Sequence, residues 1–232
     1  MNRLVNAFRA DVRYQWRYGF YFIYAFLVVG FIALVRLLPE AWRQTALVAV
    51  LLSDPALLGF FFIGGILQLE RGEGLLDALF LSPLRPWEYL TSKVASLGLL
   101  STLAGCLIAL GSGVPGIRFG RLLPALFLGS ACFTLIGVSI SVNLRSMNAF
   151  LSIDGLWEGL LLVPPLLLLF GISFPPLEIF PGSVVLRLVQ QSAGGPASAW
   201  AVIGLAGWLA GSFLAADRRL KAALGRLEGG VA

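Results

Sequence analysis

The sequence contains no histidine, and this absence removes whole classes of enzyme from consideration. Histidine is the commonest metal ligand and the commonest general base in proteins, so most metalloprotease, serine–histidine and haem sites are excluded. Cysteine is nearly as scarce: Cys106 and Cys132 are the only two, and both fall inside apolar segments. Such thiols are small core residues, so a structural disulfide is not expected.

Charge is scarce as well. Only 12% of the 232 residues are charged and 58% are hydrophobic, with a mean hydropathy of +0.88. A soluble domain carries roughly twice that charged fraction, so this chain must have lipid as its solvent. The net charge of +5 does not indicate nucleic acid, because the Lys and Arg residues lie at the ends of apolar runs. The first apolar run is too long for a signal peptide and lacks a small-x-small cleavage site, so we expect it to be retained.

Residues 2–17 are expected to form an amphipathic helix. At about 100° per residue, apolar side chains gather on one arc and four arginines gather on the opposite one. Such a helix lies flat in a membrane interface, with its arginines toward anionic headgroups. The alternative is an ordinary cytoplasmic extension of the first span.

Six apolar segments are long enough to cross a bilayer, which predicts an all-α integral membrane protein with one transmembrane domain over residues 1–232. The second segment is interrupted by Ser53-Asp54-Pro55, a helix-start signal with Asp54 as N-cap and Pro55 at the first helical position. Its helix either begins at Asp54, after a separate outer segment at residues 45–52, or is continuous and kinked. The predicted spans are residues 18–38, 45–69, 87–110, 122–142, 156–174 and 197–216.

The basic residues give an orientation. With the N-terminus inside, twelve Lys and Arg residues lie on the inner side and five on the outer side. Positive charge accumulates on the cytoplasmic side of membrane proteins, so we expect both termini to be cytoplasmic, with residues 217–232 as a cytoplasmic tail.

A charged island at residues 70–83 separates the second and third spans. Leu75, Leu76, Leu79 and Phe80 fall at helical spacing and form one apolar face. Three acids, Glu70, Glu73 and Asp77, occupy its N-terminal half, where the helix dipole favours negative charge. A helix of this kind presents charge to a soluble partner, and the alternative is an ordinary cytoplasmic loop.

The fifth span carries unusual residues. Asp154 and Glu158 stand one helical turn apart at its predicted inner start, and intramembrane acids are candidates for proton or substrate chemistry. Their other interpretation is plainer: Asp154 is the N-cap and Glu158 lies within about a turn of the interface. Pro164-Pro165 frees backbone carbonyls and bends the helix, which suits a moving or cavity-lining element.

Residues 175–195 are too apolar for a simple outer loop. A pair of short helices dipping back into the outer leaflet explains this composition, and a partly buried surface loop is the alternative. Contacts with an apolar substrate require aromatic surface reachable from the membrane. The available aromatic residues are Phe60, Phe61 and Phe62 in the second span, Phe170 in the fifth, and a Tyr/Phe cluster in the first.

A family resemblance emerges from these segments. Glu70-Arg71-x-Glu73-Gly74 is followed by Leu79, Pro83, Glu88-Tyr89 and Lys93. This arrangement resembles the region between the second and third spans of ABC-2 type permeases, the membrane subunits of ATP-binding-cassette (ABC) exporters. The segment Asp54-Pro55-Ala56-Leu57-Leu58-Gly59-Phe60-Phe61-Phe62-Ile63-Gly64-Gly65 is similar to a narrower branch, the fluoroquinolone-export permeases.

The resemblance covers most of the chain, with two departures. Gly72 stands where the family commonly has a second acid, and Leu75 stands where it commonly has threonine. An extra glycine loosens the first turn of the island. The geometry of the coupling segment is therefore the feature that these departures affect.

The resemblance implies a coupling helix within residues 70–86, seated in a cleft of a separate ATPase subunit. Its contacts are expected from Glu70, Arg71, Glu73, Asp77, Leu79 and Phe80. Residues 2–17 would be a connecting helix touching the same subunit. Two membrane subunits, identical or sibling chains, and two ATPases would form the working unit.

The expected function is export of a hydrophobic or amphipathic small molecule, drug-like or lipid-like, across the bacterial cytoplasmic (inner) membrane. The sequence has no G-x-x-x-x-G-K-[ST], so ATP and Mg²⁺ would be bound by the partner, with no cofactor on this chain. The alternative is an ion-coupled secondary transporter using Asp154 and Glu158, although midplane acids in two matching halves are missing. An intramembrane enzyme is disfavoured because no catalytic set can be assembled.

Overall fold

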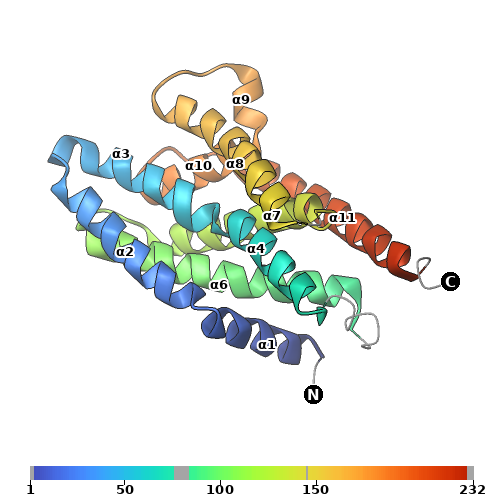
Figure 1. Cartoon of the computed structure of the whole chain (residues 1–232). Helices are drawn as coiled ribbons and strands as arrows, with labels where there is room; N and C mark the ends of the chain where they lie inside the picture. The colour runs from blue at the N-terminus through green and yellow to red at the C-terminus, as the bar shows by residue number, and fades with distance from the viewer. Residues whose placement is uncertain (1–2, 76–83, 145, 229–232) are drawn as a thin grey trace.

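The computed structural model describes residues 3–75, 84–144 and 146–228, which form helices and connecting turns without a strand (Figure 1). Six of the helical segments are long and apolar enough to cross a membrane. The prediction of an all-α membrane protein with six spans is thereby confirmed, whereas the orientation of the termini stays a prediction. The elements are α1 (Arg3–Arg17), α2 (Phe20–Leu37), α3 (Glu40–Leu51), η1 (Leu52–Ala56), α4 (Leu58–Gly72), α6 (Pro86–Ser112), α7 (Phe119–Ser141), α8 (Met147–Leu169), α9 (Pro175–Ile179), α10 (Pro181–Ser192) and α11 (Ala199–Glu228).

The second span is one continuous segment, Glu40–Gly72, with a π-helical turn, η1, at its middle. The possibility that its helix begins at Asp54 is wrong, and the continuous, kinked alternative is correct. Pro55 has no N–H to donate, so the backbone hydrogen bonding must rearrange there. Three hydroxyls bond to carbonyls at this turn: Ser53 Oγ donates to the Val50 carbonyl at 3.4 Å, Ser101 Oγ to the Pro55 carbonyl, and Tyr24 Oη to the Asp54 carbonyl at 3.5 Å.

The last two spans differ in extent from their predicted bounds. Helix α8 begins at Met147, nine residues before the predicted start, because Ser146 caps it: Ala149 N donates to Ser146 Oγ at 3.2 Å. Helix α11 continues to Glu228, through most of the predicted cytoplasmic tail. The tail is rich in Ala, Leu, Arg and Lys, which are strong helix formers, so nothing in its composition ends the helix.

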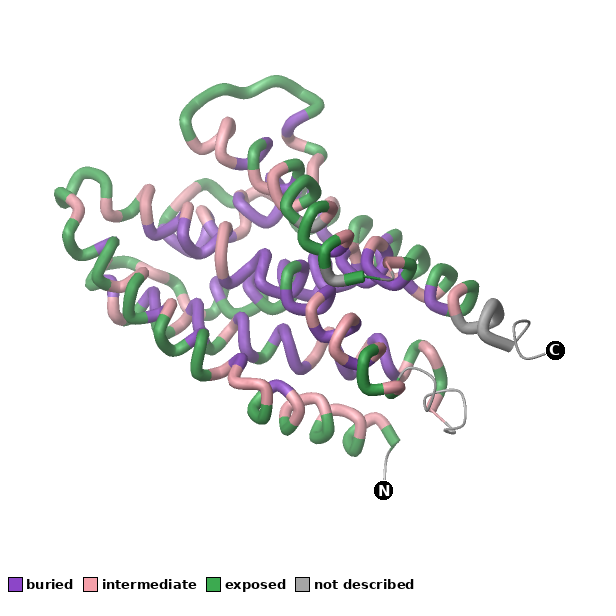
Figure 2. The backbone as a smooth tube through the Cα atoms, in the orientation of Figure 1, coloured by how far each residue is buried: buried purple, intermediate pink, exposed green. Residues whose placement is uncertain are grey.

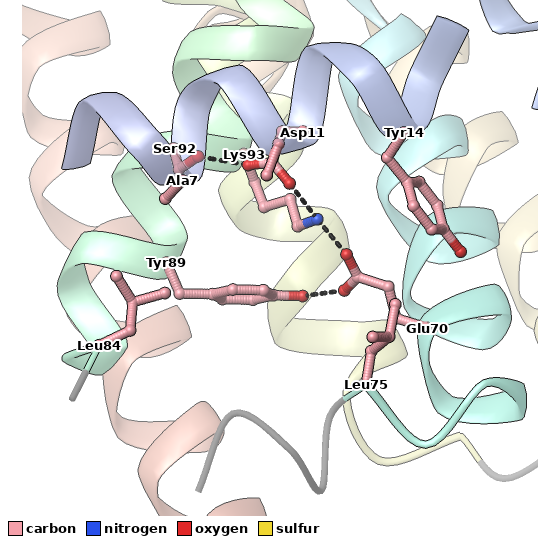
Figure 3. Close-up of a pocket in the computed structure, with 10 residues that line it drawn as sticks. Ala7, Asp11, Tyr14, Glu70, Leu75, Leu84, Tyr89, Ser92 and Lys93 are labelled. Atoms are coloured by element: carbon pink, nitrogen blue, oxygen red, sulfur yellow. Dashed lines mark hydrogen bonds and ion pairs between the residues drawn. The ribbon is translucent and has the colours of Figure 1, made fainter. Parts of the chain in front are cut away.

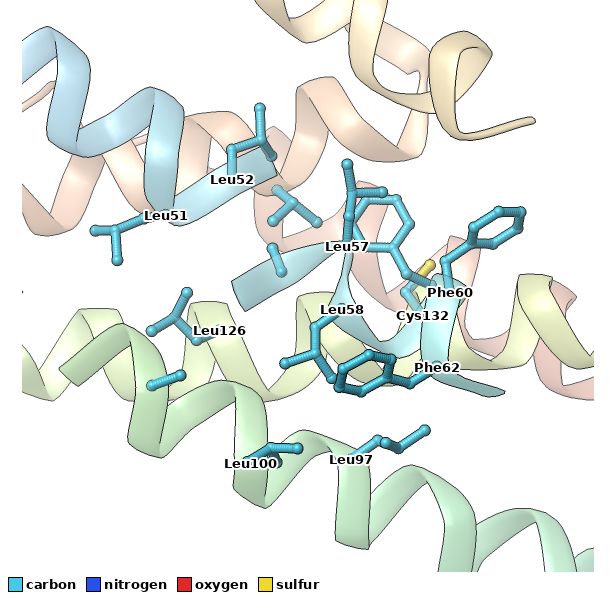
Figure 4. Packing of buried hydrophobic residues seen from close by; sticks show 14 of the residues in the cluster. Leu51, Leu52, Leu57, Leu58, Phe60, Phe62, Leu97, Leu100, Leu126 and Cys132 are labelled. Atoms are coloured by element: carbon cyan, nitrogen blue, oxygen red, sulfur yellow. The ribbon is translucent and has the colours of Figure 1, made fainter. Parts of the chain in front are cut away.

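Helix α7 lies at the centre of the bundle and packs against α4, α6, α10 and α11. Glycines set its distance from α4: a Cβ on Gly59 would lie 2.6 Å from the backbone oxygen of Ser130. Large apolar side chains such as Phe60 and Phe133 fill the remaining space. Figure 4 shows this core between α4, α6 and α7. In Figure 2 the buried residues concentrate there, whereas α2, α8 and α11 leave much of their apolar surface exposed, as lipid-facing helices do.

The chain between α8 and α11 forms two short helices, α9 and α10, that fold back along the bundle. The turn between them lies beside the C-terminal half of α8, because a Cβ on Gly182 would come within 2.9 Å of Pro165 Cγ. Trp208 of α11 donates its indole N–H to the Ile179 carbonyl at 2.8 Å, and Arg187 pairs with Glu178 at 2.7 Å. Two short helices thus exist within residues 175–195, and their insertion into the outer leaflet stays a prediction.

Candidate coupling site

Helix α1 has a polar face that is distinct from its arginines and from its apolar side. This face packs along α6, where Gln15 is buried and donates from Nε2 to Ser96 Oγ at 2.9 Å. The four arginines are exposed, and so is Trp16 on the apolar side. The helix forms over the residues predicted to be helical. It has three faces rather than the predicted two: the polar face against α6, the exposed arginines and the apolar side. Its position in a membrane interface stays a prediction.

Asp11 of α1 belongs to an ion-pair cluster that joins three helices (Figure 3). Lys93 Nζ of α6 lies 2.6 Å from Asp11 Oδ1 and also pairs with Glu70 Oε1 of α4. Tyr89 donates its hydroxyl to Glu70 Oε2 at 2.6 Å, and Ser92 Oγ donates to Asp11 Oδ2. We call these five residues the Lys93 cluster. It fastens α1 and the end of α4 to the start of α6.

The cluster is almost closed to solvent: the side chains of Lys93, Glu70 and Asp11 are 2%, 7% and 12% exposed. Burying an ion costs several kcal/mol, and this cost is offset only where partners and hydrogen bonds are well placed. Here one ammonium faces two carboxylates, and the hydroxyls of Tyr89 and Ser92 supply the additional charge-assisted hydrogen bonds. Removing one member would therefore leave uncompensated charge inside the protein.

A pocket of 290 Å³ opens beside the cluster, between α1 and the start of α6. Leu75 and Leu84, which flank residues 76–83, both line it, so these two positions of the predicted coupling segment lie beside the Lys93 cluster. Tyr14 lines the pocket from α1. Burial, followed by the negative charges of Glu73 and Glu70, raises the pKa of Tyr14 to about 12. Its phenol is therefore neutral at physiological pH.

The C-terminal end of α4 is also tied to the end of α7. Arg71 donates from Nη2 to the Val142 carbonyl at 2.7 Å and from Nη1 to the Leu144 carbonyl. Gln68 Nε2 donates to the same Leu144 carbonyl at 3.0 Å. The carbonyls that follow a helix end lack intrahelical partners, and basic side chains commonly satisfy them. Arg71 thus acts as an internal cap that connects two spans.

The chain leaves α4 through a glycine turn. Gly74 has φ +70°, and its N–H donates to the Arg71 carbonyl at 3.1 Å. An L-residue pays roughly 1–2 kcal/mol in this left-handed region, so glycine sets the direction in which the chain enters residues 76–83. Beside the turn, Tyr18 donates its hydroxyl to Glu73, which ties the start of α2 to the end of α4.

Three of the six predicted coupling residues can be located. Glu70 is buried in the Lys93 cluster, Arg71 is half-buried against α7, and Glu73 is exposed beside Tyr18. The other three lie outside the described residues: Asp77, Leu79 and Phe80. The contact of this segment with an ATPase stays a prediction.

The sequence reasoning missed the pairing partners of Glu70. Asp11 is the only acid among the residues of α1, and Lys93 lies seven residues, or about 10 Å, inside the third span. A lone lysine about two turns inside a span is expensive unless it is paired, and Asp11 is the one acid that α1 offers. The position of Lys93 could therefore have suggested an ion pair, although not its geometry.

The predicted substrate-contact residues fall into two groups. Phe60, Phe62 and the Pro164–Pro165 pair are buried, and Phe62 packs edge-on against Phe20 at 4.7 Å between ring centres. Phe61 and Phe170 are exposed. The structure thus packs the first group inside the protein and presents the second at its surface, and contact with substrate stays a prediction for all of them.

The acids of the fifth span lie farther from the start of their helix than expected. Because α8 begins at Met147, Glu158 lies at the middle of the helix rather than within a turn of its start. Asp154 is not the N-cap, since Ser146 holds that place; its side chain lies outside the described part of the structure. The early start of α8 therefore corrects the interpretation of both residues as features of the helix end.

Comparison with known proteins identifies the chain's relatives. The model of the fluoroquinolones export permease protein family matches residues 2–215. The fluoroquinolones export permease protein of Mycobacterium tuberculosis is 29% identical over 212 residues, covering 91% of this chain and 86% of that protein. The probable doxorubicin resistance ABC transporter permease protein DrrC of the same organism is 27% identical over 180 residues, covering 72% of this chain and 64% of DrrC.

These relatives confirm the ABC-2 resemblance and do not favour the ion-coupled alternative. A permease of this class is a transport subunit driven by an ATPase partner. Together with the six candidate spans, they make this chain a multi-pass protein of the bacterial inner membrane. The chain belongs to the fluoroquinolones export permease protein family, and it is the membrane-spanning permease subunit of an ABC exporter.

Proposed function

We propose that this permease exports a hydrophobic or amphipathic small molecule of the drug-like class, and that residues 70–86 and α1 receive the force of the ATPase. The names of its relatives, a fluoroquinolone exporter and a doxorubicin resistance permease, support this substrate class. The observation that carries the coupling proposal is the Lys93 cluster, which links three helices directly beside both ends of the coupling segment.

The cluster transmits a local displacement to several spans. A displacement of residues 76–83 acts on the end of α4 and on the start of α6. Lys93 holds both of these ends together and attaches α1 to them through Asp11. Arg71 adds the end of α7 through its bonds to two carbonyls. Because ion pairs and hydrogen bonds of this kind are short-ranged, these elements move as one unit or the cluster must break.

The working assembly in this proposal holds two permease chains, identical or sibling, and two ATPase subunits. ATP and Mg²⁺ bind to the ATPase, because this chain lacks the glycine-rich loop and lysine that cradle phosphates. Both termini lie in the cytoplasm, as the distribution of basic residues indicates. The permease therefore contributes the path across the membrane and no step of ATP chemistry.

The test reconstitutes the chain with its ATPase in liposomes and measures ATP-dependent movement of doxorubicin together with ATP hydrolysis. Charge reversal by Glu73→Lys or Asp77→Lys is expected to keep the complex assembled but to lower the number of molecules moved per ATP. The matched control is Glu40→Lys, an exposed acid at the opposite end of the same span. Wild-type transport in both reversals would contradict the coupling assignment.

A second measurement separates this function from ion coupling. A protonophore added while ATP is present is expected to leave export unchanged, and so is Glu158→Gln. If export stops with the proton gradient although ATP remains, the permease is driven by ions and the proposed function is wrong.

A further inference from the structure

An apolar pocket lies where the α9–α10 turn meets the middle of the bundle. Its volume is 410 Å³, within the range of sites that bind drug-sized molecules. Its lining includes Trp157 and Leu160 of α8, Ile179 at the end of α9 and Trp208 of α11. Ile136 of α7 also lines it, so the pocket is built from several separate helices.

The pocket lies halfway along the spans. Trp157 and Leu160 are ten and thirteen residues into α8, about 15–20 Å from its start, and Trp208 is nine residues into α11. Four of its side chains, Trp157, Leu160, Ile179 and Trp208, remain exposed at the protein surface. Because helices at this depth are surrounded by acyl chains, the mouth of the pocket opens toward the hydrocarbon region of the membrane.

The chemistry of the lining restricts the ligand. Every described lining residue is apolar or aromatic, and no polar surface faces the pocket. A polar group nearby, the Trp208 indole N–H, is already bonded to the Ile179 carbonyl. A charged group placed here would lose its water among apolar side chains, at a cost of several kcal/mol. The two indoles in the lining, Trp157 and Trp208, instead suit a flat ring system, which they can contact by stacking or edge-to-face packing.

We propose that this pocket binds the planar, apolar part of the exported molecule, which enters sideways from the bilayer while its polar part stays outside the pocket. The proposal rests on the proposed export function and adds the place in the fold where the ring system of the exported molecule binds. Two further occupants compete, an acyl chain of a membrane lipid and a side of a second permease copy. The two indoles in the lining favour the aromatic ligand over a flexible chain.

The α9–α10 turn gives the pocket a way to change shape. Gly182, the second residue of α10, packs against Pro165 and beside the Leu161 carbonyl, which Pro165 leaves without its helical N–H donor. A change in the bend of α8 at the proline pair therefore moves the turn that closes the pocket. Binding at the pocket and the position of α9–α10 are consequently coupled.

The test fills the pocket and measures binding without the ATPase. The permease in lipid nanodiscs is titrated with doxorubicin, a planar and amphipathic probe. Leu160→Trp and Ile179→Trp each place bulk in the pocket, from α8 and from α9, and each is expected to weaken binding at least tenfold. The control is Leu156→Trp, which adds the same ring to an exposed position of α8 outside the lining and is expected to change binding less than twofold.

The outcomes separate the pocket from the export function. If neither filled variant changes doxorubicin binding, or if the wild type binds none, the inference is overturned even where the complex with the ATPase exports the probe. Loss of a co-purified phospholipid in Leu160→Trp, with doxorubicin binding intact, would assign the pocket to lipid. Conversion of a dimer to a monomer by either variant, again without an effect on binding, would assign it to a second copy.

Discussion

Replacement of Lys93 by methionine is the perturbation whose consequence follows most directly from the structure. The substitution keeps the length and apolar stem of the side chain but removes its ammonium. Asp11 and Glu70 are then left as buried carboxylates that face no cation within the cluster. Breaking a buried ion pair in this way costs about 3–5 kcal/mol. For a chain of this size each kcal/mol lowers the Tm by roughly 2–4 °C, so the loss is about 6–20 °C.

The control for this prediction removes all three charges together. In the triple variant Asp11→Asn, Glu70→Gln and Lys93→Met, no ion remains to be compensated, and replacing a buried ion cluster by neutral groups is often close to neutral. We therefore expect the triple variant to regain most of the Tm that Lys93→Met alone loses. Lys93→Arg keeps the charge and should be intermediate, since a planar guanidinium does not fit a site built for a compact ammonium.

The assay is thermal unfolding of the purified permease in detergent, followed by ATP-driven transport in liposomes. The stability argument is refuted if Lys93→Met unfolds within 2 °C of wild type, or if the triple variant is no more stable than the single one. The coupling argument is tested separately: the triple variant is folded but has lost the tie between α1, α4 and α6. It should hydrolyse ATP with the ATPase while transporting less substrate per ATP.

Three further predictions concern single contacts. Gly74→Ala should lower the free energy of unfolding by roughly 1–2 kcal/mol, because the φ of +70° at this position is left-handed. Gly72→Ala, whose added Cβ would have nothing within 4 Å, should not lower it, and thermal unfolding compares the two variants. Arg71→Met should cost about 1–3 kcal/mol by leaving carbonyls beyond α7 unpaired, measured in the same way. Gly59→Ala should sharply reduce the yield of folded protein, since the added Cβ would lie 2.6 Å from a backbone oxygen of α7. Gly207→Ala, whose added Cβ would have no atom within 4 Å, should leave the yield unchanged.

The number of spans could be predicted because hydropathy and length alone determine it. A helix in lipid must satisfy its own backbone, so an apolar segment of about 20 residues has essentially one structure available. The ends of the spans could be predicted less accurately, because several local signals compete to set where a helix begins and ends. Asp54-Pro55 resembles a helix start, yet the helix continues through a π-helical turn, whose carbonyls accept hydrogen bonds from Ser101 and Tyr24 of two other spans.

The candidate site likewise has features that could be predicted from the sequence and features that could not. Hydropathy and helical period were enough to predict a membrane protein, a charged island at residues 70–83 between two spans, and a basic, amphipathic α1. They could not predict that Asp11, Glu70 and Lys93, up to 82 positions apart, share one buried cluster, which is a property of the folded bundle. Hydropathy and helical period act locally along the chain, whereas the pairing of buried charges depends on which helices come together in space.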